Sequence, residues 1–117
     1  MAPNIPLNMR SYQREKVELI AQYFIVDKSV KYLGCTVVNL SRNGAGALFP
    51  RKEKLSEGAF ILLDIIAPKT FERLSMLGEI RRTKKRWDAI YAGIQFAEIL
   101  PDAAYKALCD QQATAAP

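Results

Sequence analysis

The sequence contains no histidine, only two cysteines and no long apolar run. Without histidine, the chain lacks the commonest general base and the commonest metal ligand. Cys35 and Cys109 lie far apart in the sequence, which fits no common metal-ligand spacing, and we interpret both as small buried hydrophobic residues. The longest apolar stretch, residues 59–67, is interrupted by Asp64 and is much shorter than the roughly 18 residues that a membrane helix needs.

These absences argue against several classes of function. No acid–base pair and no nucleophile arrangement is visible, so we expect a protein that is not an enzyme and that uses no metal or cofactor. Residues 1–8 lack the charged start and the apolar centre of a signal peptide. We therefore expect a cytoplasmic protein that does not insert into a membrane.

What the sequence does contain is a basic chain of domain size. Its 117 residues are half hydrophobic and one quarter charged, and the formal net charge is +5. This length fits one domain. The basic balance favours an anionic partner such as a nucleic acid, a nucleotide or a membrane surface, but charge alone does not choose among them.

The hydrophobic pattern is typical of a small β protein. Alternating and β-branched residues, separated by turn signals, predict strands over residues 17–26, 32–40, 45–49, 60–66, 74–82 and 87–96. The nearly apolar segment 60–66 should lie centrally in the sheet. Pro101 and Asp102 are typical of a helix start, which predicts a helix over residues 101–111. The pattern indicates a small antiparallel barrel or sandwich, and the helix could cover one open end of a barrel.

Two arginines precede the first predicted strand. Arg10 and Arg14 lie four residues apart in a polar, basic segment. An arginine fork donates paired hydrogen bonds to guanine O6 and N7 or to phosphate oxygens, and its flat face stacks on a base. These two residues are therefore candidates for a cationic clamp, although a solvated segment before a strand would have the same composition.

A second group of candidate residues follows the second predicted strand. Asn39 offers an amide, Ser41 offers a hydroxyl, and Gly44 permits a positive φ and lets a ligand approach the backbone. Asn39 and Ser41 would point to the same face of the sheet if the strand continues there. Taken alone, the segment is also typical of a type I′ hairpin turn at Asn43 and Gly44.

The densest basic cluster is the segment 81–86. We interpret it either as a solvated hairpin tip centred on residues 83–86 or as a docking patch for a partner or an acidic surface. Trp87 and Tyr91 are expected to pack in or on the barrel and not to stack on a ligand. Nucleic acid is not an expected partner, because no aromatic residue interrupts the basic strip.

Together, the arginine pair and the second group resemble the PilZ domain family. That family carries an R-x-x-x-R motif followed, further along the chain, by D/N-x-S-x-x-G. Arg10 and Arg14 match the first motif, and Asn39, Ser41 and Gly44 match the second, with Asn where Asp is common. Residues 91–96 look like the family's late strand, which often reads G-x-x-F. The resemblance spans roughly residues 10–100.

The resemblance implies a six-stranded antiparallel β-barrel that binds cyclic di-GMP, a bacterial second messenger. Arg10 and Arg14 would contact guanine and phosphate from the arm, Asn39 and Ser41 would contact a guanine edge, and Gly44 would keep the turn open. On this basis we expect a flexible arm over residues 1–9, one PilZ-like barrel domain over residues 10–112 and a frayed tail over residues 113–117.

The resemblance also implies a role in signalling. Ligand binding would change the conformation of the arm and signal to a protein partner that controls motility, pili or exopolysaccharide. Arg42 and Asn43, within the turn, are candidates for additional phosphate contacts. The alternative is a degenerate PilZ-like adaptor that binds only protein. Ligand stoichiometry, oligomeric state and the effect of Asn39 on affinity stay open at this point.

Overall fold

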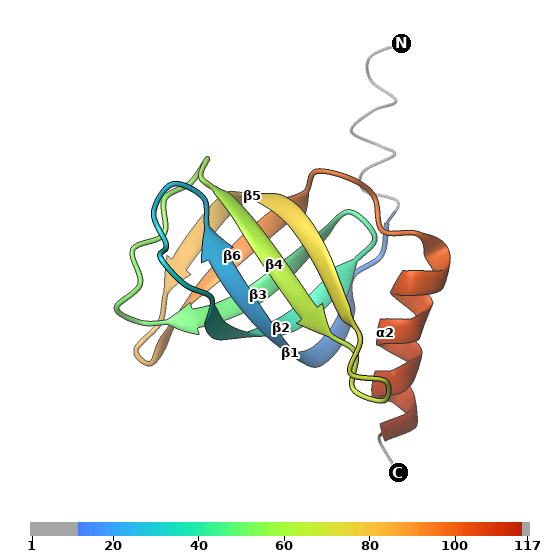
Figure 1. The fold of residues 1–117 in the computed structure, drawn as a ribbon. Helices are drawn as coiled ribbons and strands as arrows, with labels where there is room; N and C mark the ends of the chain where they lie inside the picture. Colours follow the sequence, from blue (N-terminus) through green and yellow to red (C-terminus); the bar gives the residue numbers. More distant parts are fainter. Residues whose placement is uncertain (1–11, 116–117) are drawn as a thin grey trace.

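Six segments of the chain alternate between inward and outward side chains, and each forms a strand in the computed structural model, which describes residues 12–115. The strands and the one helix of this part of the chain are β1 (Glu15–Ile25), β2 (Leu33–Ser41), β3 (Gly44–Pro50), β4 (Phe60–Ile66), β5 (Arg73–Lys85), β6 (Ala89–Phe96) and α2 (Asp102–Ala115). All strand pairs are antiparallel, and the order β1-β2-β3-β6-β5-β4 closes on itself as a barrel (Figure 1). The predicted fold class, a mainly-β six-stranded barrel with a C-terminal helix, is confirmed.

One detail of the strand prediction was wrong. β5 continues through the basic cluster to Lys85, so the hairpin tip is residues 86–88 and not residues 83–86. β4 lies between β1 and β5 and, like every strand of a barrel, turns one face outward. Its first residue, Phe60, is half exposed.

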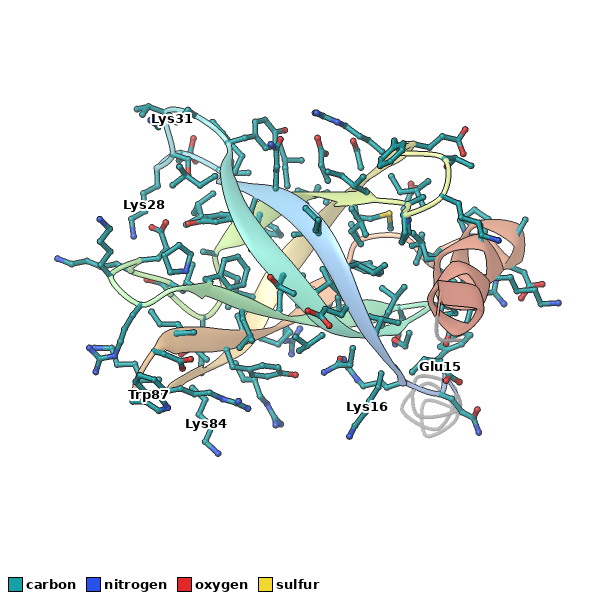
Figure 2. All side chains as sticks on the ribbon, turned by 90° about the horizontal axis from the view of Figure 1, so that it is seen from below. Glu15, Lys16, Lys28, Lys31, Lys84 and Trp87 are labelled. Atoms are coloured by element: carbon teal, nitrogen blue, oxygen red, sulfur yellow. The ribbon has the colours of Figure 1, made fainter. Side chains whose placement is uncertain are left out.

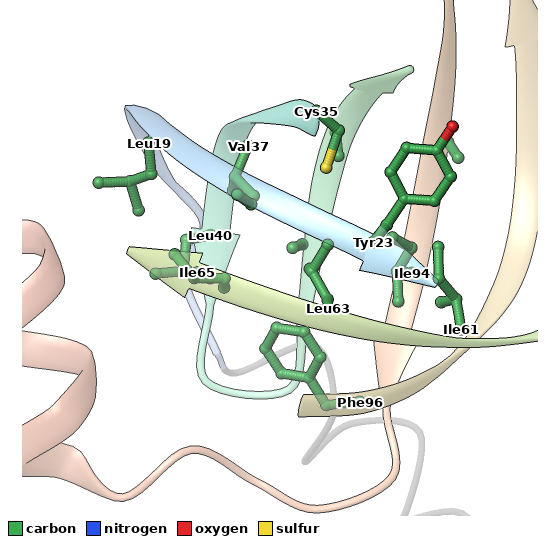
Figure 3. Close-up of a cluster of buried hydrophobic side chains, with 14 of the residues drawn as sticks. Leu19, Tyr23, Cys35, Val37, Leu40, Ile61, Leu63, Ile65, Ile94 and Phe96 are labelled. Carbon is green, nitrogen blue, oxygen red and sulfur yellow. The ribbon is translucent and has the colours of Figure 1, made fainter. Parts of the chain in front are cut away.

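The core fills the barrel from alternate positions of all six strands. Figure 3 shows part of it, with labelled residues from β1, β2, β4 and β6. Tyr23 and Phe49 meet edge to face, with ring centroids 4.8 Å apart. The Tyr23 hydroxyl donates to the Glu53 carboxylate, which satisfies the polar end of a fully buried ring. Burial, followed by that hydrogen bond and the negative charge of Glu53, raises the pKa of Tyr23.

Helix α2 lies at one end of the barrel, as the sequence predicted, and places Leu108 in the core (Figure 1). It continues to Ala115, past the predicted end at residue 111. The Tyr105 hydroxyl donates to the backbone carbonyl of Gln13 at 3.4 Å, which ties the helix to the segment that enters β1. No helix within residues 12–115 has the length and apolar character needed to cross a membrane.

Neither Cys35 nor Cys109 forms a disulfide, and the two side chains differ in exposure. Cys35 is buried, as predicted, whereas Cys109 is only half-buried. Burial raises the pKa of Cys35 to about 12. At pH 8, about one in ten thousand Cys35 side chains would therefore be thiolate, the reactive form. We expect iodoacetamide to label Cys109 well before Cys35 in the folded protein, as measured by mass spectrometry of the peptides. Equal labelling rates would contradict the buried position of Cys35.

Candidate functional site

One row of residues crosses the outer face of strands β2, β3, β6 and β5. It has polar side chains at its two ends and glycines in the middle. The register pairs Asn39 with Gly46, Gly46 with Gly93, and Gly93 with Arg82. Two glycines side by side leave the sheet without side chains at the centre of the row. Asn39 lies on one side of these two glycines and Arg82 on the other.

Neighbouring side chains lean over both glycines. A Cβ atom on Gly46 would lie 2.2 Å from the hydroxyl oxygen of Tyr91 and 2.5 Å from Nδ2 of Asn39. A Cβ atom on Gly93 would lie 3.2 Å from Cγ of Arg82. Glycine at these two positions is therefore what allows Tyr91 and Arg82 to lie across the sheet at the centre of the row.

Two β-bulges turn the key polar residues outward. The β2–β3 register shifts between Val37 and Asn39, and the β5–β6 register shifts between Ile80 and Arg82. A bulge inserts one extra residue, so the alternation of inward and outward side chains restarts after it. Val37 and Ile80 point into the core with no exposure, whereas Asn39 and Arg82 face outward. The second bulge also lets the adjacent residue Arg81 share the outer face.

Arg14 brings the segment before β1 onto this face. Its Nη1 donates to Oδ1 of Asn39 at 2.6 Å, and its Nη2 lies 3.5 Å from the position that a Cβ atom on Gly44 would take. The chain just before it is held by the Tyr105 bond to Gln13. Arg14, the second arginine of R-x-x-x-R, thus bonds to Asn39 and lies near Gly44. These are the first and last residues of the D/N-x-S-x-x-G motif.

Asn39 is the centre of a small polar network. Its Oδ1 accepts from Arg14, and its Nδ2 donates to the hydroxyl of Tyr91 at 3.2 Å. The guanidinium of Arg86 lies over the Tyr91 ring, 5.8 Å from the ring centroid, in a cation–π contact. The network therefore joins the entry to β1, the wall of the barrel and the tip of the β5–β6 hairpin.

A pocket of about 440 Å³ opens beside this network. The residues that line it are Arg14, Asn43, Arg81, Arg82, Tyr91, Gly93, Ile94 and Gln95. Its volume lies in the range of about 300–1,000 Å³ typical of small-molecule sites. Three guanidinium groups at one pocket favour a ligand with more than one negative charge.

Arg81 is oriented by two partners at the rim of the pocket. Its Nη1 donates to Oε1 of Gln95 at 3.1 Å and lies 3.8 Å from the carboxylate of Glu79. The side chains of Arg81 and Glu79 are 59% and 38% exposed, so this ion pair adds little stability. It does fix the direction of the guanidinium. Within residues 12–115 no group of histidine, cysteine or acidic side chains is placed to hold a metal ion.

The remaining predicted residues fall into different environments. Ser41 is buried, donates to Oδ1 of Asn43 at 2.8 Å and accepts from the backbone NH of Asn43 at 3.3 Å, so here it supports the turn. Its contact with a ligand stays a prediction.

Asn43 lines the pocket, but Arg42 points elsewhere. The Arg42 guanidinium donates to the carbonyl of Leu100 at 2.9 Å and lies over the Tyr12 ring. Arg10 lies outside the described residues.

Gly44 matters for a different reason from the one predicted. It has no positive φ, and Gly58 is the described glycine that does. The two-residue turn is formed by Arg42 and Asn43, so the type I′ interpretation at Asn43 and Gly44 was wrong. Glycine is needed because a Cβ atom there would lie 2.5 Å from the backbone oxygen of Ile94 on β6.

Sequence reasoning missed the residues of β5 and β6. Arg81 and Arg82 were assigned to a basic cluster without a ligand role, and Tyr91 was expected only to pack. Trp87 does not pack on the barrel, since it is 86% exposed. The available signal was the alternation in β6, where inward Ile90, Ala92 and Ile94 require Tyr91, Gly93 and Gln95 to face outward.

Comparisons with known proteins agree with this geometry. A sequence profile described as the PilZ domain matches residues 8–111. No curated protein matches the chain by sequence. The fold is similar to that of the inhibitor of motility MotI/DgrA from Bacillus subtilis, with a TM-score of 0.68 and 15% identity, over 91% of this chain and 51% of that one.

Two isolated PilZ domains are also similar. The PilZ domain of YcgR from Escherichia coli, solved with c-di-GMP, gives a TM-score of 0.68 and 15% identity over 91% of this chain and 93% of that one. The PilZ domain of CeSA from a cellulose-synthesizing bacterium gives a TM-score of 0.58 and 14% identity over 88% of this chain and 97% of that one. This chain thus spans about half of MotI/DgrA and nearly all of these two domains. At such low identities the structural likeness shows the fold, whereas the profile match covers most of the sequence. The chain belongs to the PilZ domain family.

Proposed function

We propose that this PilZ domain is a receptor that binds cyclic di-GMP on the outer face of strands β2, β3, β6 and β5. The observation that carries the proposal is the hydrogen bond of Arg14 to Asn39, close to Gly44 at the rim of the pocket, because it joins the two family motifs in space. The likeness to a YcgR domain solved with c-di-GMP supports the same ligand.

The chemistry of the pocket suits this ligand. Cyclic di-GMP offers two phosphate charges and two guanine bases, and the arginine forks of Arg14, Arg81 and Arg82 can meet phosphate oxygens or guanine O6 and N7. Asn39 provides both a donor and an acceptor for a guanine edge. Arg10, four residues before Arg14, is the proposed second clamp residue.

Signalling by this domain is proposed to depend on exchange of the Arg14–Asn39 bond. A guanine that takes the Oδ1 acceptor of Asn39 replaces Arg14 there, and Arg14 becomes available to the ligand. That exchange moves the segment before β1 and presents a new surface to a partner protein. Control of motility, pili or exopolysaccharide by such a partner, in the cytoplasm, belongs to the same proposal.

The test is chemical-shift mapping of the ¹⁵N-labelled chain during addition of cyclic di-GMP. We expect saturable shifts in the backbone signals of Arg14, Asn39, Gly46 and Gly93. GMP at equal concentration, which has one base and one phosphate, serves as the control and should shift them less. Saturable shifts confined to the opposite strands, β1 and β4, would place the ligand elsewhere and refute the proposed site.

Tyr91→Phe tests the role of the network in binding. The substitution removes the hydroxyl that accepts from Asn39 and leaves the ring under Arg86. A neutral hydrogen bond contributes about 0.5–1.5 kcal/mol, so we expect affinity to fall by roughly twofold to tenfold. Isothermal titration calorimetry measures it. Unchanged affinity would mean that Tyr91 does not position Asn39 for the ligand.

One observation favours the adaptor alternative. Both polar ends of the Asn39 amide are already bonded, to Arg14 and to Tyr91, so the network is satisfied without a nucleotide. In an adaptor this network would hold the surface in one shape for a protein partner. The titration separates the two functions, because an adaptor gives no shift at any nucleotide concentration.

A further inference from the structure

Three loops gather at the end of the barrel opposite α2. In a closed antiparallel barrel the β1–β2, β3–β4 and β5–β6 connections must all leave from the same end (Figure 1). Two hydrogen bonds join them into one surface. Lys28 donates to the backbone carbonyl of Lys54, and Nε of Arg51 donates to the backbone carbonyl of Arg86 at 2.9 Å. We name residues 26–32, 51–59 and 84–88 the loop end.

The loop end exposes apolar side chains at two of its tips. Trp87 is 86% exposed and Val30 is 94% exposed. Figure 2 shows Trp87 beside Lys84 on one side of this end, and Lys28 and Lys31 on the other side. A single exposed apolar residue is ordinary. Here, however, each tip stands among cations at the same end of the barrel.

Positive charge dominates this surface two to one. Its basic residues are Lys28, Lys31, Arg51, Lys52, Lys54, Lys84, Lys85 and Arg86, and its acidic residues are Asp27, Glu53, Glu57 and Asp88. Of the acidic groups, Glu53 is engaged by the Tyr23 hydroxyl. The loop end therefore attracts an anionic surface.

We propose that the loop end binds the surface of an anionic membrane, with Trp87 and Val30 entering the headgroup layer. Tryptophan is enriched at membrane–water interfaces. Each lysine or arginine near an anionic leaflet adds about 1 kcal/mol of attraction. The domain associates with the membrane surface and does not cross the membrane.

The balance of lysine and arginine favours lipid over an acidic protein. Six of the eight cations are lysines. Lysine is depleted in the cores of protein interfaces, where arginine is enriched. A lipid headgroup also has a site to occupy, because Val30, Lys28 and Lys31 help to line a hollow of about 240 Å³. The residues that line this hollow are Lys28, Ser29, Val30, Lys31, Leu33 and Glu53.

The inference goes beyond nucleotide binding and does not depend on it. None of the loop-end residues lines the pocket that contains Arg14. The two surfaces are nevertheless connected, because Arg86 of the hairpin tip lies over the ring of Tyr91, which does line that pocket. Because no loop-end residue lines that pocket, membrane binding can be tested on the chain without any nucleotide.

The experiment uses the fluorescence of Trp87, the single tryptophan of the chain. The 117-residue protein is mixed with vesicles of phosphatidylcholine alone or of phosphatidylcholine with phosphatidylglycerol. We expect a blue shift of the emission only with the second kind, and we expect added salt to weaken it. Lys84→Gln/Lys85→Gln should reduce the partition coefficient about 30-fold, since two cations are lost.

The matched control is Lys69→Gln/Arg73→Gln, which removes the same charge from the β4–β5 connection and the first residue of β5, at the other end of the barrel. It should leave partitioning close to that of the unmodified chain. Equal losses in the two variants would refute a specific loop end. An unchanged emission spectrum with anionic vesicles would refute the proposal. A blue shift that appears with polyglutamate but not with vesicles would assign the surface to an acidic protein instead.

Discussion

Arg14→Ala is expected to weaken cyclic di-GMP binding by about 1.5–3 kcal/mol, the usual contribution of a charged hydrogen bond. This corresponds to roughly a tenfold to 150-fold loss of affinity. The reason is geometric as well as electrostatic, because Arg14 is the residue that joins the segment before β1 to Asn39 and Gly44. Calorimetric titration of the two proteins under the same salt conditions measures the difference.

Two further variants separate charge from geometry. Arg14→Lys keeps the positive charge but loses the planar fork, so we expect only a partial recovery of affinity. Lys16→Ala removes an exposed cation two residues away and is the control for net charge. If Arg14→Ala and Lys16→Ala lost the same small amount, Arg14 would act as one charge among many and the assigned contact would be wrong.

The second large effect concerns the glycines of β3. Gly44→Ala places a Cβ atom 2.5 Å from the backbone oxygen of Ile94, which can move only with strand β6. Crowding of this kind costs about 1–3 kcal/mol. We expect a lower free energy of unfolding, measured by urea denaturation. The β3–β6 pairing holds one side of the site, so ligand affinity should fall as well.

Gly46→Ala has a different expected signature. The new Cβ atom would meet side-chain atoms, the Tyr91 hydroxyl at 2.2 Å and Nδ2 of Asn39 at 2.5 Å, and both side chains can rotate away. We expect a smaller loss of stability than in Gly44→Ala and a clear loss of ligand affinity, because the network around Asn39 is displaced.

Gly34→Ala is the control for both glycine variants. No atom lies within 4 Å of a Cβ atom at that position, so only the ordinary gain of chain stiffness remains, about 0.4–1 kcal/mol in favour of the folded state. If Gly44→Ala were as stable as Gly34→Ala, the close approach of β3 and β6 would be refuted.

The strands of this fold could be predicted because their burial alternates. β4 and β6, for example, place every second residue in the core, and the predicted ranges for both lie within a few residues of the observed ones. Barrel closure was implied by the family resemblance and not by the pattern, since a sandwich has the same alternation.

The site was predictable only where it lies close in sequence to a motif. Arg14, Asn39 and Gly44 come together as expected, although for Gly44 the reason is contact with Ile94 and not backbone conformation. Ser41 turned out to be buried in support of the turn. The role of Arg10 stays a prediction, since the structure describes the chain from residue 12.

The rest of the site could not be predicted because it depends on bulges. The bulge before Arg82 restarts the alternation and turns two adjacent arginines outward, and no rule of period two predicts where such a residue is inserted. The same holds for Asn39, which would face the core with Val37 if β2 were regular. Tyr91 was missed for a different reason. The alternation in β6 predicts that it faces outward, but which residues lie beside it across the sheet depends on the strand order.

The central claim is that cyclic di-GMP binds beside Arg14 and Asn39 on the outer face of the barrel. Isothermal titration calorimetry of the unmodified chain and of Arg14→Ala/Asn39→Ala tests it most directly and also gives the stoichiometry. We expect saturable binding to the unmodified chain and no measurable binding to the double variant, with circular dichroism showing both folded. Absence of binding to the folded, unmodified chain, or equal affinity for both proteins, would contradict it.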